Sequence, residues 1–192
     1  RIKEIPICEN HEELIDLKLL SVERIAMMDQ PTHPFAGPLF NSGLPNASKM
    51  RVSVFLKLQK MIEQLDALSI EFGYKSGQID ILVFEGLRDL SVQKMLFENK
   101  LNEILVLNPD MTFERAEQES AKWISPVKNN IPVHSTGAAV DIRLWDHKNH
   151  CFLDLGPFGV IWGDSQLAPT FSEGITDTEK SNRLYCLLAA EK

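Results

Sequence analysis

Residues 133–145, VHSTGAAVDIRLW, carry the pattern that decides the fold. From residue 138 to residue 145 the side chains alternate between two faces, as they do in a strand with one buried side. One face carries Val140, Ile142 and Leu144, and the other carries Ala139, Asp141, Arg143 and Trp145. Gly137 comes before the strand and allows a sharp turn. We therefore expect the turn to bring His134 and Asp141 together on one side.

The elements on either side of this strand indicate an α+β fold. Apolar spacing and turn residues define them. In chain order they are a helix over 47–68, a strand over 79–84, helices over 89–105 and 112–123, a hairpin turn at 147–150 with a returning strand at 151–153, and a last helix from residue 177. Asp177 or Thr178 is the expected N-cap of the last helix. We expect helices packed on a small, mainly antiparallel sheet rather than a doubly wound fold.

The rest of the chain is less regular. Residues 12–20 fit either a strand or a short helix. Residues 31–50 are rich in proline and glycine and predict a loop, which is either a lid or a surface wrap. Trp123, Trp145 and Trp162 are expected in the core or lining a cleft.

Length and composition are those of one globular domain. The chain has 192 residues, of which 44% are hydrophobic and 24% charged. Its formal charge of −7 argues against a nucleic-acid or anionic-membrane binder, and no apolar run reaches the roughly 20 residues of a membrane span. The three scattered cysteines are expected as reduced thiols. A cytoplasmic location is expected, or a periplasmic one if a leader preceded Arg1.

His134 and Asp141 suggest metal chemistry. Imidazole and carboxylate are good zinc ligands, and a catalytic zinc typically takes three protein ligands plus water. The alternative is a histidine bonded within a turn and an aspartate paired with Arg143 or a lysine. The spacing of these two residues does not by itself decide between the two interpretations.

The wider stretch resembles a known motif. Residues 134–141 are similar to most of the S-x-H-x-x-G-x-A-x-D motif of the zinc D-alanyl-D-alanine dipeptidases, the VanX-type peptidases. The match holds at His134, Gly137, Ala139 and Asp141, whereas Pro132 stands where the family usually has serine.

Three further segments match the same family in the same order. Residues 81–93 resemble the segment containing D-x-Y-R-P-x-x-x-Q, and Arg88 aligns with the arginine placed beside the scissile carbonyl. Leu87 and Asp89 replace the usual aromatic residue and proline. Residues 154–158, DLGPF, resemble D-M-G-x-x-F-D, although Gly159 replaces its second aspartate, and Asn182-Arg183 resembles an N-R pair. Without this context Arg88 reads as a surface arginine paired with Glu85 or Asp89.

The resemblance implies a single D,D-dipeptidase-like domain over residues 1–192, with the Hedgehog/DD-peptidase type of fold. It implies a zinc metallopeptidase that hydrolyses D-alanyl-D-alanine, with Zn²⁺ on His134 and Asp141 and with Arg88 as the catalytic residue that stabilises the oxyanion. A small D,D-dipeptide is then the expected partner. Substrate-binding residues are not assigned, although Asp154 is a conceivable contact for the substrate amine.

One family motif is missing from the sequence. The family completes its site with E-x-x-H, which supplies the general base and the third zinc ligand, and no E-x-x-H occurs here. His147 and His150 lie in the predicted hairpin turn and are not expected to replace that ligand. We expect, in order of preference, a chain truncated at its C-terminus, a degenerate relative, or a partner chain that supplies the ligand. The 192-residue chain alone is expected to be inactive.

Two rival functions remain open from the sequence. One is a catalytically incomplete module that binds cell-wall peptides or a protein. The other is a zinc D,D-carboxypeptidase that acts on longer wall peptides. The loop at 31–50 could exclude such longer peptides by closing over a small ligand. The sequence does not indicate the oligomeric state.

Overall fold

The computed structural model describes residues 8–28, 46–128, 131–156, 167 and 170–191. Its larger sheet has four strands in the order β2-β4-β5-β6, and a second sheet pairs β1 with β3. The strands are β1 (Leu14–Asp16), β2 (Ile25–Met27), β3 (Lys49–Arg51), β4 (Ile79–Glu85), β5 (Asp141–Asp146) and β6 (Cys151–Phe152). The β2–β4 pair is parallel, whereas β1–β3, β4–β5 and β5–β6 are antiparallel.

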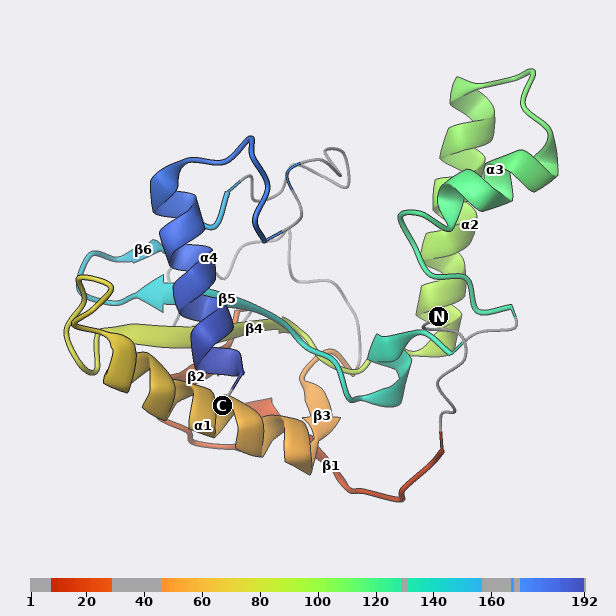
Figure 1. Ribbon diagram of the computed structural model, residues 1–192. Helices are drawn as coiled ribbons and strands as arrows, with labels where there is room; N and C mark the ends of the chain where they lie inside the picture. The colour runs from red at the N-terminus through yellow and green to blue at the C-terminus, as the bar shows by residue number, and fades with distance from the viewer. Residues whose placement is uncertain (1–7, 29–45, 129–130, 157–166, 168–169, 192) are drawn as a thin grey trace.

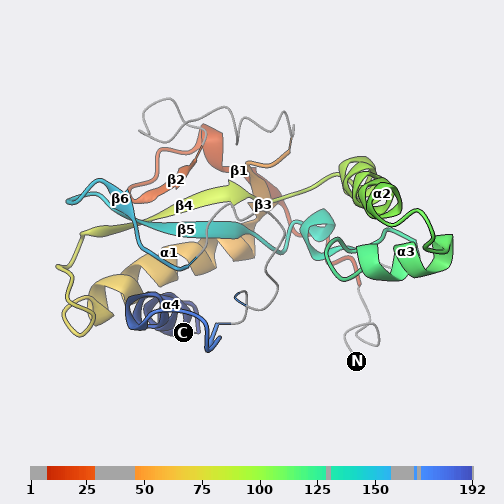
Figure 2. The ribbon, with the colours of Figure 1, turned by 90° about the horizontal axis from the view of Figure 1, so that it is seen from above.

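Two helices cover one face of the larger sheet. Helices α1 (Val52–Leu68) and α4 (Asp177–Ala190) lie side by side below the strands in Figure 2. The main core lies between these helices and the sheet, because alternate residues of β4 and β5 point towards it. Its most buried members include Leu65, Ile79, Ile81, Val83, Leu144 and Tyr185. The core therefore fixes β4 and β5, the strands that lead to the predicted site.

The other two helices stand apart from this core. Helices α2 (Leu90–Leu107) and α3 (Phe113–Ser120) form a hairpin to one side of the sheet (Figure 1). They bury a separate small cluster of Leu101, Ile104 and Ala116. Lys100 lies over the ring of Trp123, with its Nζ 5.4 Å from the ring centroid.

The α+β prediction and the mainly antiparallel sheet are confirmed. Some boundaries were wrong: the first helix begins at Val52 and not at residue 47, because residues 49–51 pair with β1 as a strand. The strand expected from residue 138 begins at Asp141. The N-cap of α4 is Thr176, which forms a capping box with Glu179, and not Asp177 or Thr178.

Of the two irregular segments, residues 12–20 are described by the structure and most of residues 31–50 are not. Residues 12–20 contain both predicted alternatives, strand β1 and a 3-10 helix over Leu17–Leu19. Most of the loop at 31–50, together with Trp162, lies outside the described residues.

Trp145 is buried, and Cys8, Cys151 and Cys186 are free thiols. None of the helices in the described part of the chain has the length and hydropathy needed to cross a bilayer.

Candidate metal centre

His134 and Asp141 meet at the start of β5. His134 lies in a 3-10 helix, η3 (Val133–Thr136), which ends at Gly137 with a φ of 71°. This left-handed conformation turns the chain back, and it is one that glycine adopts readily. The turn leaves His134 Nε2 at 3.5 Å from Asp141 Oδ1. The predicted bend and the predicted pairing of these two side chains are therefore present.

The imidazole ring of His134 is oriented by a backbone carbonyl. Its Nδ1 lies 3.0 Å from the carbonyl oxygen of Gly86. A carbonyl can only accept a hydrogen bond, so Nδ1 must carry the proton, and in the neutral ring Nε2 keeps its lone pair. That lone pair belongs to the nitrogen nearest Asp141. The ring is thus in the tautomer that can ligate a metal beside the carboxylate.

Backbone bonds from two other segments hold the 3-10 helix in place. The amide of Arg88 donates to the His134 carbonyl at 3.1 Å, and the amide of Arg51 donates to the Gly137 carbonyl at 2.9 Å. The Nε of Arg51 also donates to the Thr136 carbonyl at 2.9 Å. The position of His134 therefore depends on β3 and on the segment after β4 as well as on its own short helix.

Arg88 is a buried and well-paired residue near this centre. Its Nε and Nη2 donate to the two carboxylate oxygens of Glu85 at 2.6 and 2.5 Å, and its Nη1 donates to Gln93 Oε1 at 2.8 Å. The Glu85 carboxylate raises the pKa of Arg88, and Asp141 adds to this rise. The pairing with Glu85 that belongs to the alternative interpretation is present, but Arg88 is not a surface residue, because it is only 9% exposed.

A break in the strand register lies beside these groups. The pairing of β4 with β5 shifts between Val83 and Glu85, so that Glu85 is opposite Asp141. Such bulges redirect side chains and are common next to active sites. Gln93 was not singled out from the sequence, and Glu85 was considered only as the partner of a surface arginine, although the two occupy the first and last positions of the D-x-Y-R-P-x-x-x-Q motif. Their role in holding Arg88 could have been inferred from that motif.

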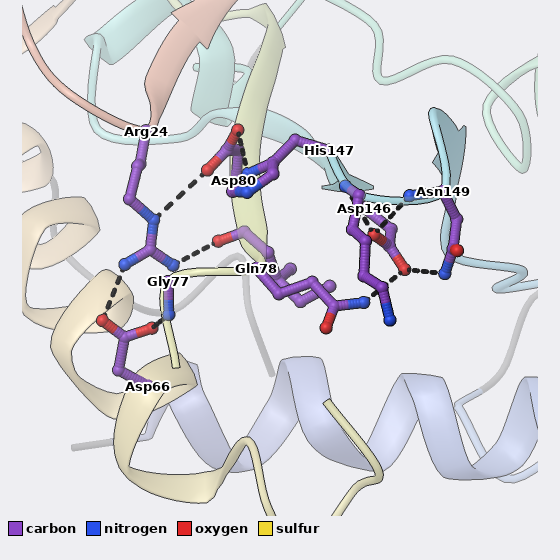
Figure 3. Close-up of polar contacts among 10 residues, drawn as sticks. Arg24, Asp66, Gly77, Gln78, Asp80, Asp146, His147 and Asn149 are labelled. Carbon is purple, nitrogen blue, oxygen red and sulfur yellow. Dashed lines mark hydrogen bonds and ion pairs between the residues drawn. The ribbon is translucent and has the colours of Figure 1, made fainter. Parts of the chain in front are cut away.

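A second histidine–aspartate pair lies at the opposite end of the same strands (Figure 3). His147 Nδ1 is 3.3 Å from Asp80 Oδ2. The other oxygen of Asp80 accepts a bond from Arg24 at 3.2 Å, and Arg24 also pairs with Asp66 at 2.6 Å. Because a guanidinium neutralises this carboxylate, the second pair is a poor cation site. His147 and the exposed His150 are therefore not part of the candidate centre at His134.

The third ligand expected from the family is not found in the described part of the chain. There, no three histidine, cysteine, aspartate or glutamate side chains are grouped so that they could hold a metal ion. His11 is exposed, and His33 lies outside the described residues. The chain therefore brings together two of the predicted ligands and the arginine.

The two remaining family segments, residues 154–158 and Asn182-Arg183, are joined by hydrogen bonds. Asn182 Nδ2 donates to the Asp154 carbonyl at 2.9 Å, and Arg183 Nε donates to the Leu155 carbonyl at 2.6 Å. Gly156 has a φ of 96°, in the left-handed region that favours glycine, and it packs against the end of the Arg183 side chain. Asp154 Oδ1 accepts the Gly156 amide at 3.0 Å, and its suggested contact with a substrate amine stays a prediction.

Comparisons with known proteins agree with the motifs. No family model matches the chain. The chain is 27% identical over 152 residues to a D-alanyl-D-alanine dipeptidase from Synechocystis sp., an alignment that covers 74% of this chain and 57% of the relative. The chain thus spans a little over half the length of this curated relative. The resemblance seen in the separate motifs is confirmed by a match that runs through most of the chain.

Two solved structures also resemble part of the chain. One is VanYB in complex with D-alanine-D-alanine, with 20% identity and a TM-score of 0.37, covering 56% of this chain and 51% of the other. The second is the vancomycin resistance D,D-pentapeptidase VanY in complex with Zn(II), with 18% identity and a TM-score of 0.35, covering 54% and 49%. Because these scores are low, the relationship rests on the sequence.

Proposed function

We propose that this chain, a relative of the D-alanyl-D-alanine dipeptidases, forms part of a zinc D,D-peptidase in which His134 and Asp141 bind the metal and Arg88 stabilises the reacting carbonyl. The separation of the two ligand atoms supports this proposal most directly. Two ligands at about 2.1 Å from a tetrahedral zinc lie about 3.4 Å apart. His134 Nε2 and Asp141 Oδ1 are 3.5 Å apart, so a zinc ion fits between them with little movement.

The chemistry of the donors also fits zinc. His134 presents a nitrogen whose ring is fixed from the other side by Gly86, and Asp141 presents a carboxylate whose side chain is 59% exposed and open to a ligand. When bound, zinc would polarise the scissile carbonyl and activate a water molecule at neutral pH. A third ligand and a general base are then required from outside the described residues.

Arg88 is suited to stabilise negative charge on the substrate carbonyl oxygen. Its bonds to Glu85 and Gln93 use three of the five guanidinium N–H groups, which leaves one on each terminal nitrogen within the described structure. The same bonds hold the guanidinium rigid before substrate arrives. A donor fixed in this way contributes about 3–4 kcal/mol in comparable oxyanion sites.

Zinc affinity tests the proposed ligands. The dissociation constant of zinc is measured by competition with a chromophoric chelator for the unmodified chain, His134→Gln and His147→Gln. We expect the His134 variant to bind more than about tenfold more weakly, a loss that even changes around a metal ligand can cause. The His147 variant is the matched control, because it removes the other histidine of a histidine–aspartate pair. Equal affinities for all three proteins would exclude this metal site.

The substrate is tested by comparing ligands of different length. We propose D-alanyl-D-alanine itself, because the curated relative carries the name of that activity. NMR shifts of the zinc-loaded chain are followed as this dipeptide, or a longer peptide with the same C-terminus, is added. Shifts at Arg88 with the dipeptide alone support a dipeptidase, and equal shifts with both indicate a D,D-carboxypeptidase. No shift with either would contradict both assignments.

Release of free D-alanine separates catalysis from binding. With zinc added, we expect the 192-residue chain to release little D-alanine from the dipeptide, because the sequence has no E-x-x-H motif and the Glu85 carboxylate is paired with Arg88. NMR shifts caused by the dipeptide, without release of D-alanine, would then indicate a site that binds substrate but lacks a group needed for catalysis. Rapid turnover would show that this chain supplies its own general base and would contradict this expectation.

A further inference from the structure

Gly86 occupies a position where the backbone is pressed against another strand. Its amide donates to the Ala47 carbonyl at 2.7 Å, and the Leu87 amide donates to the Lys49 carbonyl at 2.7 Å. A Cβ atom at residue 86 would lie 2.2 Å from the Lys49 carbonyl oxygen and 3.2 Å from that of Ala47. Gly86 is not among the glycines with a positive φ. Glycine is therefore required here for space and not for its backbone conformation.

The same residue touches the candidate metal ligand. The Gly86 carbonyl accepts the bond from His134 Nδ1 at 3.0 Å. Two residues later, the Arg88 amide donates to the His134 carbonyl at 3.1 Å. Residues 86–88 thus hold both the ring and the backbone of His134, and their own position is set by β3.

We propose that Gly86 is a positioning residue for metal binding: its close approach to β3 sets the carbonyl that fixes the tautomer and the orientation of the His134 ring. This inference rests on the proposed zinc site and extends it to a residue that contacts neither metal nor substrate. A carbonyl suits this role because it accepts a hydrogen bond from the Nδ1–H group without adding a charge beside Asp141.

Any side chain at residue 86 would disturb this arrangement. The atom in the way is a backbone carbonyl of β3, a strand that also pairs with β1, so it cannot rotate aside. Increasing the distance from 2.2 Å to an ordinary contact of about 3.5 Å requires the segment at 86 to shift by more than about 1 Å. Such a shift would break or weaken the bond to His134.

The test compares Gly86→Ala with Gly73→Ala. Gly73 has a φ of 81° and open space around its position, so its replacement strains the backbone without touching the site. The first measurement is the ¹⁵N spectrum of the His134 ring in the metal-free protein, above the pH at which the ring loses its charge. We expect the Nδ1-protonated form in the unmodified chain and in Gly73→Ala, and a loss of this preference in Gly86→Ala.

The second measurement is zinc affinity by chelator competition. We expect Gly86→Ala to bind zinc about tenfold more weakly or worse, as is typical when a partner of a ligand is lost, and Gly73→Ala to bind like the unmodified chain. Unchanged tautomer and affinity in Gly86→Ala would overturn the inference. If the variant does not fold, an Nε2-protonated ring in the unmodified chain would overturn it equally. If the unmodified chain binds no zinc, the proposed function fails, while the tautomer comparison still decides the role of Gly86.

Discussion

Opposing influences act on the His134 imidazole. The Asp141 carboxylate raises the pKa of His134, the bond to Gly86 adds to this rise, and burial and the Arg88 charge act in the other direction. The net effect is a pKa above the usual value. Because zinc binds only the neutral ring, protons compete with the metal over a range that extends above the ordinary pKa of histidine. The Asp141 carboxylate therefore both binds the metal and strengthens this competition.

Removing the Asp141 charge should lower the pKa of His134. In metal-free Asp141→Asn, we expect the ring to titrate at lower pH than in the unmodified chain. The titration is followed through the imidazole proton shifts in NMR spectra. Identical His134 titrations in the two proteins would show that the 3.5 Å contact does not persist in solution.

The same pKa shift predicts how stability depends on pH. A group whose pKa is raised by folding stabilises the folded state when it is protonated. In metal-free protein the contribution of His134 is therefore fully present below the unfolded pKa of histidine, and it is lost as the pH rises through the raised folded pKa. Urea denaturation across this range should show the loss in the unmodified chain and a smaller loss in Asp141→Asn. A larger loss of stability in Asp141→Asn would contradict the assignment of this pH dependence to the contact between His134 and Asp141.

Arg88 should contribute strongly to stability through Glu85. The side chains of Arg88 and Glu85 are 10% and 13% exposed, so removing one leaves the other as a buried, unpaired charge. We expect Arg88→Ala to lower the free energy of unfolding by about 3–5 kcal/mol. Replacing Arg88 and Glu85 together should cost less than the sum of the single changes. Strict additivity would indicate that the pair is not coupled.

At the scale of elements, the long helices and strand β4 were predicted closely because their patterns are local and repeated. Strands β2 and β3 were missed, and β1 was predicted only as one of two alternatives for residues 12–20. Each has three residues, too few for an alternating pattern, and each forms only by pairing with distant residues, as Ile25 does with Ile81. Helix η3 was not predicted, but the turn at Gly137 was, because one glycine decides it. The bulge at Glu85 was not, because it depends on the register between two strands.

The turn at Gly137 should tolerate no side chain. Its φ is 71°, and a Cβ atom would lie 2.9 Å from Leu14 Cδ2. We expect Gly137→Ala to lower the free energy of unfolding by more than about 1 kcal/mol and to weaken zinc binding. Gly77→Ala is the matched control, because it has a similar φ of 77° with open space around it. A similar loss of zinc affinity in both variants would contradict a specific role for this turn.

At the scale of the whole molecule, the described part of the chain contains two separate hydrophobic clusters. The main core lies between the larger sheet and helices α1 and α4, while α2 and α3 bury a smaller one between themselves. Helical spacing in the sequence identified these helices but could not indicate which partner each would pack against. The hairpin begins at Leu90, two residues after Arg88, so its first helix follows directly on the candidate site. The assignment of residues 1–192 to a single domain stays a prediction.

The two clusters should differ in their response to core changes. Leu144 is fully buried in the main core, and Leu144→Ala is expected to cost about 2–5 kcal/mol and to speed hydrogen exchange throughout β4 and β5. Leu101 lies in the hairpin cluster, so Leu101→Ala should speed exchange in α2 and α3 with little change in β4. If Leu101→Ala instead accelerates exchange equally in both regions, the hairpin and the sheet unfold as one unit.

The central claim is that a zinc ion sits between His134 and Asp141, and anomalous diffraction from zinc-soaked crystals of the chain tests it most directly. The account predicts a zinc peak about 2.0–2.2 Å from both His134 Nε2 and one Asp141 oxygen. A peak at His147 and Asp80, or a zinc-free pair with the His134 ring turned away from Asp141, would contradict it.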